Sequence, residues 1–311
     1  MRECPFDSGQ SERQWWDQLP PVPAVTSLLI WQQNRRRWKP GSLAHMFARF
    51  PRLQEVHYEP WREWDAMQSF TDKDFQYLFE SIPRFNTNLK RLVVFGNFNQ
   101  QYPDIMQRFV FGEDISKCDS IRKPSPAISR MVALASLELE HLAASFIIDA
   151  SHFFEMRPSW DWPNLASLVI TSKSLAPNED SVKIGAMLQT AAAAAIKMPQ
   201  LKTMEIWNGR KGLAALFKYH VSRDIRRAII TWRGTWELTM EPSTIQAWEA
   251  VVNRYHGGWR LHLVQERLDK AAIKSHGDAI YYLMLSNQVI RPISLQQIQI
   301  EQKSLEGAKI V

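Results

Sequence analysis

Cysteine is scarce in this chain, and long apolar runs are missing from it. Its 311 residues include two cysteines, Cys4 and Cys118, and neither stands in a CxxC or Cys/His spacing. This pattern argues against a disulfide framework and against a structural zinc site. No apolar run approaches the roughly 18 residues of a membrane helix, and the N-terminal stretch lacks the apolar core of a signal peptide. We therefore expect an intracellular protein, cytoplasmic or nuclear, with no membrane partner.

The motifs of common enzymes are missing as well. The sequence has no GxGxxG, GxxxxGK[ST], HExxH or GxSxG motif and no EF-hand loop. The usual sequence signatures of dinucleotide binding, phosphate-loop binding, zinc proteases, serine hydrolases and EF-hand calcium binding are therefore missing. The eight histidines show no spacing typical of metal ligands. We expect no catalytic residue, no metal and no cofactor.

The charge of the chain is modestly basic. Its 38 Lys and Arg outnumber its 32 Asp and Glu, for a net charge of +6. The basic residues are scattered, except for a cluster at residues 35–39. Because a nucleic-acid interface needs basic residues gathered on one surface, nucleic acid is an unlikely partner.

What the sequence does contain is a recurring block of the form Φxx Φ x Φ, in which Φ is apolar. Seven copies occur, and segments with helical periodicity separate several of them. The copies are Val25-Leu28-Ile30, Leu53-Val56-Tyr58, Leu89-Leu92-Val94, Leu134-Leu137-Leu139, Leu165-Leu168-Ile170, Leu201-Met204-Ile206 and Ile225-Ala228-Ile230. Short strands that alternate with helices at this spacing are typical of leucine-rich repeats, which stack to build one continuous core.

The fold prediction is therefore α/β: an irregular leucine-rich-repeat-like solenoid with a parallel strand face, outer helices and a C-terminal α+β cap. We expect a loose N-terminal segment at 1–20, a repeat array at 21–240 and a capping region at 241–311 that shields the open end of the array. A doubly wound α/β sheet is the alternative, because it also alternates strands with helices.

Several local elements follow from periodicity and capping residues. Asp72 and Asp180 offer N-cap oxygens, alternation around Arg233-Gly234 favours a β-hairpin, and the charged, Ser- and Pro-rich stretch 111–130 indicates a long loop. Helices are expected at residues 42–50, 72–85, 143–156, 180–198, 212–221 and 243–255, and a strand at 259–265.

Six stretches of the chain also resemble a known family: 60–64, 89–102, 147–156, 207–212, 230–238 and 276–298. They are similar to uncharacterised proteins of filamentous fungi, often called hypothetical or F-box domain-containing, and the resemblance spans residues 20–301. It implies a leucine-rich-repeat-like structure. Where family members carry an F-box before the repeats, it also implies recruitment of proteins to a ubiquitin ligase. This chain shows no such F-box region, so we expect an adaptor role only if an F-box is supplied elsewhere.

In such a repeat, the residues between and after the last two Φ positions face the concave side. The leading hypothesis is a non-enzymatic module that binds a protein or peptide on this strand face, with aromatic anchors and a local acidic charge. The predicted partner-binding residues are Trp31, His57, Glu59, Phe95, Glu138, Glu140, Glu205 and Trp207. The aromatic side chains of Trp31, Phe95 and Trp207 could instead be covered by loops or by a terminal cap that contains Trp232, Trp236 and Trp248.

The closest approach to a phosphate-binding loop is Asn208, Gly209, Arg210 and Lys211, expected between a strand and a helix. Free N–H groups at a helix start beside two cations could hold an anion, although solvated side chains at a turn give the same pattern. His276-Gly277-Asp278 fits either an acid/base pair or, more simply, a capped turn before a helix. The alternative function is an enzyme with a Trp-lined cleft that acts on a carbohydrate or a phosphorylated ligand.

Overall fold

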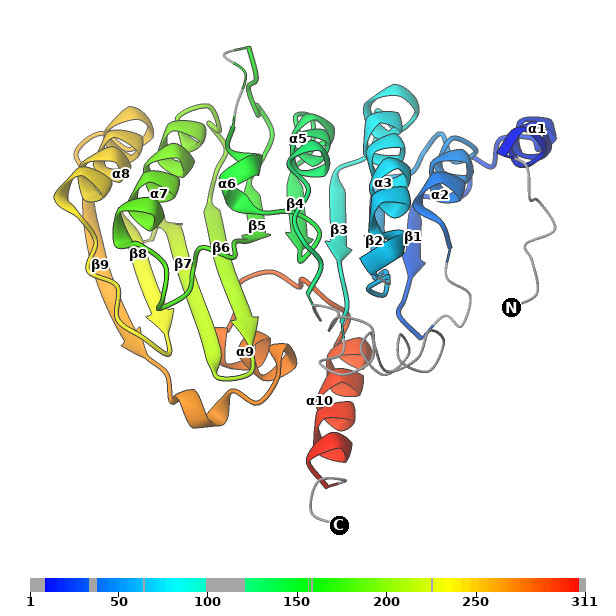
Figure 1. Ribbon diagram of the computed structural model, residues 1–311. Helices are drawn as coiled ribbons and strands as arrows, with labels where there is room; N and C mark the ends of the chain where they lie inside the picture. The colour runs from blue at the N-terminus through cyan, green and yellow to red at the C-terminus, as the bar shows by residue number, and fades with distance from the viewer. Residues whose placement is uncertain are drawn as a thin grey trace.

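A computed structural model describes residues 9–33, 38–63, 65–98, 121–155, 157, 159–224 and 226–307. In this part of the chain, nine strands form one open sheet whose spatial order equals the chain order (Figure 1). The strands are β1 (Ser27–Ile30), β2 (Glu55–Tyr58), β3 (Arg91–Phe95), β4 (His141–Ser145), β5 (Ser167–Thr171), β6 (Thr203–Arg210), β7 (Leu213–Ser222), β8 (Arg227–Gly234) and β9 (Arg260–Arg267).

The sheet is mostly parallel. Strands β1 to β6 pair in parallel, β7 runs antiparallel to both of its neighbours, and β8 and β9 pair in parallel. The predicted α/β class is confirmed. The doubly wound alternative was wrong, because its strand order reverses at a switch point and the order of this sheet does not.

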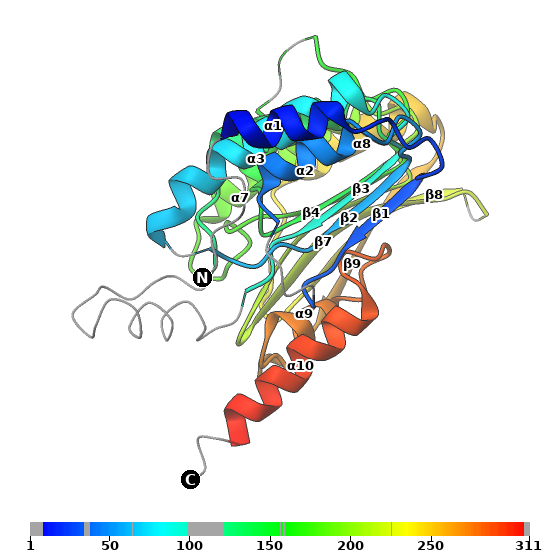
Figure 2. The same cartoon turned by 90° about the vertical axis from the view of Figure 1, so that its right-hand side faces the viewer.

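One face of the sheet carries a layer of helices (Figure 2). Connections between successive parallel strands share one handedness, so their helices collect on the same side. The helices that lie between the strands in sequence are α2 (Pro40–Phe47), α3 (Asp65–Phe85), α5 (Pro126–Ala135), α6 (Ala150–Phe153), α7 (Ser181–Ala195) and α8 (Pro242–Tyr255), while α1 (Gly9–Gln18) packs against α2.

The alternation within each strand decides which side chains meet this layer. Leu92, Leu168 and Met204 pack into a large apolar core between the sheet and the helices, and their neighbours Val93, Val169 and Glu205 point the other way. In five of the seven predicted blocks, both of the last two positions are buried in this core, and in the other two blocks the last position is buried and the one before it is partly buried. The core begins with Ile30 and extends to Ile230 and Val252.

The opposite face is covered by the chain's own C-terminal segment, residues 268–307. This segment holds a 3-10 turn (Lys270–Ala272), α9 (His276–Leu283) and α10 (Pro292–Gly307), and its helices lie across the sheet from the helix layer (Figure 2). We expected the C-terminal region to shield the open end of the array. Residues 242–267 do lie at the end of the array, as α8 and β9, whereas residues 268–307 pack beneath the sheet instead of over its end.

Four predicted elements differ from the structure. The helix expected at 143–156 is replaced by the end of β4 and the four-residue helix α6. Residues 212–221 form strand β7, because the run Leu213 to Phe217 is buried on both faces, where helical and strand periodicity cannot be told apart. Strand β8 continues through Arg233-Gly234 without a hairpin. The strand predicted at the block 134–139 lies later in the chain. It begins at His141, and its core residues are Leu142 and Ala144.

The outlying parts of the chain also bear on the predictions. The first 20 residues, expected to be loose, include α1. Most of the predicted loop at 111–130 lies outside the described residues, and its described end begins α5. The basic cluster at 35–39 is likewise described only at Trp38 and Lys39.

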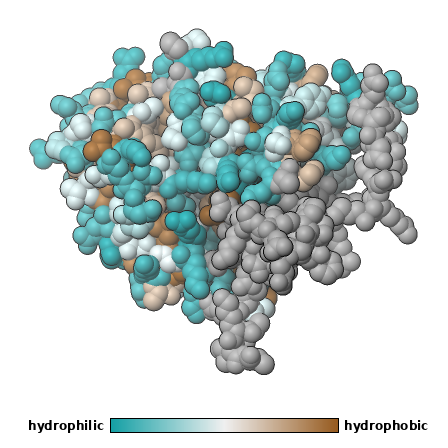
Figure 3. Space-filling model, in the orientation of Figure 1, coloured by the Kyte–Doolittle hydropathy of each residue, from teal (hydrophilic) through white to brown (hydrophobic). Residues whose placement is uncertain are grey.

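No helix among the described residues combines the length and apolarity required to cross a bilayer. On the face shown in Figure 3, hydrophilic side chains predominate and the hydrophobic areas are scattered.

Candidate functional site

The strand face predicted to bind a partner is buried beneath the C-terminal segment. Trp207 and Phe95 have no solvent exposure, and they belong to a second apolar cluster with Ile280 and Leu283 of α9. His57 is buried as well, at 4% exposure. The prediction that these side chains form an open concave surface was wrong, because the segment after β9 returns across the sheet.

Two buried carboxylates hold this cover in place. Glu205 accepts hydrogen bonds from the backbone N–H of Ser286 at 2.8 Å and from the Ser286 hydroxyl at 2.8 Å, and the Lys218 ammonium lies 3.5 Å away. Glu59 accepts from the backbone N–H of Arg291 at 2.8 Å and from the Ser294 hydroxyl. Two of the four predicted acidic residues, Glu59 and Glu205, therefore bind a segment of the same chain.

The other predicted residues of this face lie apart. Trp31 is 37% exposed beside β1, with the Arg291 guanidinium 5.8 Å from its ring centroid. Glu138 and Glu140 precede β4 and take no part in the covered face. A hydrogen bond from Lys90 lowers the pKa of Glu140, and the two groups lie 2.9 Å apart.

His276 lies at the N-terminus of α9, deep inside the covered face. Its ring stacks on Phe98 with centroids 4.0 Å apart, and its Nε2 lies 3.3 Å from Asn97 Oδ1. Burial lowers its pKa to about 3, which keeps the ring neutral. Ser275 caps α9 by accepting a hydrogen bond from the Asp278 N–H, so the capped-turn interpretation of residues 276–278 is confirmed.

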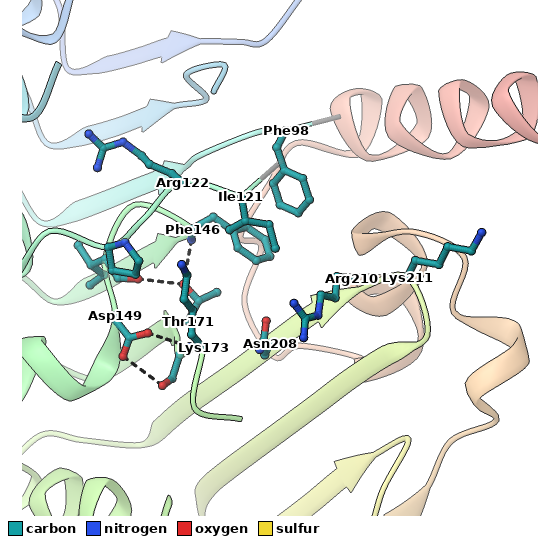
Figure 4. A pocket seen from close by; sticks show the side chains of 13 residues that line it. Phe98, Ile121, Arg122, Phe146, Asp149, Thr171, Lys173, Asn208, Arg210 and Lys211 are labelled. Atoms are coloured by element: carbon teal, nitrogen blue, oxygen red, sulfur yellow. Dashed lines mark hydrogen bonds between the residues drawn. The ribbon is translucent and has the colours of Figure 1, made fainter. Parts of the chain in front are cut away.

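The strongest candidate site is a cavity of about 410 Å³ at the carboxyl ends of β3 to β6, here called the carboxyl-edge cavity. In parallel sheets, ligands characteristically bind at this edge. Its walls come from segments far apart in sequence (Figure 4). They are lined by Phe98, Ile121, Arg122, Pro124, Phe146, Ile148, Asp149, Thr171, Ser172, Lys173, Asn208, Arg210 and Lys211.

A strained backbone shapes one wall of this cavity. Phe146 has a φ of 59°, the left-handed region that only glycine enters without cost. Its N–H donates to the Thr171 hydroxyl at 2.8 Å, and that hydroxyl lies 3.2 Å from the Ile148 carbonyl, to which it donates. Gly96 leaves room for this turn, because a Cβ there would lie 3.0 Å from the Phe146 carbonyl oxygen. Strain of this kind gathers at functional sites.

Asp149 organises the adjacent wall. Its Oδ1 accepts from the N–H and hydroxyl of Ser151 and from the Ser172 hydroxyl, and its Oδ2 accepts from the Lys173 N–H at 2.7 Å. The carboxylate thus caps α6 and ties the loop after β4 to the loop after β5. Its four hydrogen bonds commit it to positioning this wall.

The cations of the cavity have different roles. Arg122 is 4% exposed, and its guanidinium is paired with Glu63 at 2.8 Å and with Asp72. It points away from the space between the walls, whereas the Arg210 guanidinium reaches toward Asn208, and the Lys211 side chain extends outward (Figure 4). Asp72, predicted to cap a helix, lies inside α3 instead, in this ion pair. Of Arg122, Arg210 and Lys211, Arg210 is therefore the best placed to meet a bound anion.

The predicted anion site is thus partly assembled. Asn208, Arg210 and Lys211 line the cavity, and Gly209 lies between them with Trp207 and Ala279 close to its Cα. The expected helix start is absent at this point. Lys211 and Gly212 instead form the turn between β6 and β7, with Gly212 at a φ of 72°, so a helix N-terminus supplies no N–H groups here.

Sequence reasoning missed most of the cavity. Phe146 and Asp149 were not singled out, since the stretch 143–156 was assigned to a helix. The Trp-lined cleft of the alternative function does not match the lining, in which the described aromatic side chains are Phe98 and Phe146. The described residues hold no group of three or more His, Cys, Asp or Glu arranged to bind a metal.

Comparison with known proteins gives one result. No curated protein and no solved structure matches the chain, and the resemblance to fungal F-box-type proteins stays a prediction. A family model described as a family of unknown function (DUF6546) matches residues 81–291. That range begins in α3, includes strands β3 to β9 and α9, and ends at Arg291, just before α10. The chain belongs to this family of unknown function.

Proposed function

We propose that the protein binds a small organic anion in the carboxyl-edge cavity. The observation that carries the proposal is the pairing of an apolar wall, made by Phe98, Ile121 and Phe146, with the Arg210 guanidinium on the facing strand. Ligand pockets typically combine such walls with a few polar groups that fix orientation. The apolar body of the ligand would lie against the phenylalanines, and its carboxylate or phosphate would meet Arg210.

The size and charge of the cavity support this ligand class. A volume of about 410 Å³ lies within the range of small-molecule sites. Asp149 is the acidic residue of the lining, and hydrogen bonds from Ser151, Ser172 and Lys173 already disperse its charge. Arg210, Lys211 and Lys173 then leave the site net positive.

Fluorescent dyes provide the test. Anilinonaphthalene sulfonate has an aromatic body and one anionic group, and phenylnaphthylamine has the same kind of body without the charge. We expect Arg210→Gln to weaken binding of the sulfonate dye about tenfold, which corresponds to about 1.4 kcal/mol, and to leave the neutral dye unchanged. Displacement of the sulfonate dye by phenyl phosphate and by benzoate would then separate the two anion classes.

The matched control is Arg223→Gln. Arg223 is an exposed arginine in the turn between β7 and β8, at the opposite edge of the sheet from the cavity. This variant should bind both dyes as the unmodified protein does. Equal weakening of both dyes by Arg210→Gln, or no effect on either, would contradict the proposal.

The scaffold assignment is a further part of the proposal. The sequential strand order, the single helix layer and the repeated core positions support an irregular leucine-rich-repeat-like array. A protein or peptide partner on the strand face stays a prediction, and so does a role of this chain as a ubiquitin-ligase adaptor for such a partner. Either would require the C-terminal segment to leave Glu59 and Glu205.

A further inference from the structure

The two edges of the sheet are unlike each other. At one edge, β1 has four residues, whereas at the other edge β9 has eight. The order of the sheet ends at β9, so one side of this strand has no neighbouring strand among the described residues (Figure 1). A long edge strand presents unpaired N–H and C=O groups that another strand can pair with.

The sequence of β9 does little to prevent such pairing. Proteins usually protect an edge strand with charged side chains, proline or a short length, yet β9 reads RLHLVQER, with its charges confined to its ends and no proline. Leu263 and Val264, at its centre, are 47% and 38% exposed. An apolar centre on an unpaired edge indicates a surface that is covered in solution.

The charges of β9 are complementary to a second copy of the same strand. If two copies run antiparallel with Leu263 opposite Leu263, Arg260 of each copy lies opposite Glu266 of the other. Opposite charges at facing positions stabilise a strand pair, and like charges destabilise it. A slip of one residue would set Arg260 against Arg267, so the charges favour the first register.

Glu266 is already oriented by its own chain. It lies beside Arg233 of β8, with which it forms an ion pair, and the two residues are register partners. Cross-strand neighbours share a face of the sheet, so Arg233, Glu266 and the second copy's Arg260 would form one ladder of alternating charge. On the other face, the two copies of Leu263 would meet at the twofold axis.

We propose that the protein forms a homodimer in which β9 pairs antiparallel with β9 of a second copy, with Leu263 at the centre. The two sheets then continue into each other, and their helix layers lie on the same side. The carboxyl-edge cavity lies on β3 to β6 and is not part of this surface, so the dimer can be tested independently of ligand binding.

The first test measures mass by light scattering on the full chain over an about 100-fold dilution series, because association depends on concentration. The unmodified protein should be dimeric at the upper end of the series. Arg260→Glu alone and Glu266→Arg alone each place like charges opposite each other, so each variant should be monomeric. In a mixture, a copy with Arg260→Glu can pair with a copy with Glu266→Arg. That pairing restores opposite charges at both facing positions, so the mixture should regain the dimer.

The second test addresses register. Arg267 faces Trp259 in the proposed pairing but Arg260 after a one-residue slip. Arg267→Glu should therefore leave the dimer unchanged, whereas tighter association would indicate the slipped register and overturn the proposed one. A protein that stays monomeric throughout the series, a dimer that persists in Arg260→Glu, or a mixture that remains monomeric would each overturn the proposal.

Discussion

The two faces of the sheet are both buried, but they are built from different chemistry. The helix-covered face is almost wholly apolar, with residues such as Leu92, Leu168 and Ile206 repeated at the same position of successive strands. The face under the C-terminal segment mixes apolar residues with the carboxylates of Glu59 and Glu205 and the imidazole of His276. The first face is held by repeated apolar packing, and the second depends on a few specific hydrogen bonds to buried polar groups.

This difference has an energetic consequence. Apolar burial is nondirectional and continuous along the repeated core. Loss of one buried side chain there therefore lowers the unfolding free energy of the sheet and helix layer together. The second face depends on donors that must meet two buried carboxylates, and a buried polar group that loses its partner carries its full desolvation cost. We therefore expect damage to the first face to lower global stability and damage to the second to release the C-terminal segment.

The largest effect is expected from Trp162→Ala. Trp162 has no solvent exposure, and its Nε1 donates to the Ser136 hydroxyl at 2.8 Å. Removal of a buried tryptophan costs about 3–5 kcal/mol through lost burial and the cavity left behind. Urea unfolding should show a loss of unfolding free energy of that size, while the exposed Trp31→Ala changes it by less than about 0.5 kcal/mol. Similar effects for the two variants would contradict the helix-side core.

A smaller and more local effect is expected from Glu205→Ala. The change leaves the Ser286 N–H and the Lys218 ammonium without their partner, at a cost of about 1–3 kcal/mol. Limited trypsin digestion should then cut the C-terminal segment faster, at Lys270 and Lys274. The matched control is Glu138→Ala, an exposed glutamate outside the covered face. If digestion of both variants follows the unmodified protein, Glu205 does not anchor the segment.

Acid should weaken the same face through His276. Its pKa falls from an unfolded value of 6.5 to about 3, so below pH 6.5 the unfolded state takes up a proton that the folded state refuses. Stability is therefore intact above pH 6.5 and is lost progressively as the pH falls toward 3. At pH 5 the loss is about 2 kcal/mol, from 1.36 kcal/mol per pKa unit.

The pH effect is measured as the difference between two proteins. Urea unfolding at pH 7 and pH 5 should show a larger loss for the unmodified protein than for His276→Gln, which has no group to titrate. Burial also lowers the pKa values of His141 and His220, and these contributions cancel in the comparison. Parallel pH dependence of the two proteins would contradict the assignment to His276.

The smallest effect is expected at the start of α7. The Asp180 carboxylate accepts a hydrogen bond from the Val182 N–H at 2.9 Å, as its N-cap position predicts. Asp180→Ala should lower the unfolding free energy by about 1 kcal/mol, and thermal unfolding would measure it. Asp224→Ala, in the turn between β7 and β8, serves as the control. If Asp224→Ala lowered the unfolding free energy as much as Asp180→Ala, the capping interpretation would be contradicted.

The repeated core could be predicted from sequence because its signal is local and occurs several times. Leu165, Leu168 and Ile170 lie within six residues of one another, and so do their equivalents in most other blocks. The same reasoning failed at β7, where residues 213–217 are apolar without interruption and show no periodicity. It also misplaced β4, because the end of α5 supplies a leucine pattern similar to that of a strand.

The candidate site was harder to predict because it depends on contacts between distant residues. Glu59 meets Ser294 across 235 positions of the chain, and no local pattern encodes that return. Arg210 was proposed as part of an anion site on the basis of its glycine-flanked turn. Phe146 and Asp149 were missed, since a left-handed phenylalanine and a carboxylate that caps a four-residue helix have no distinctive sequence pattern.

The most direct test of the central claim is hydrogen exchange at the backbone amides of Ser286 and Arg291. Both amides lie outside helices and strands, and each donates to a buried carboxylate beneath the C-terminal segment. If the segment covers the strand face, both should exchange about 100-fold or more slowly than in an unstructured chain, and Ser286 should lose its protection in Glu205→Ala. Exchange of both amides at free-chain rates in the unmodified protein would contradict the account.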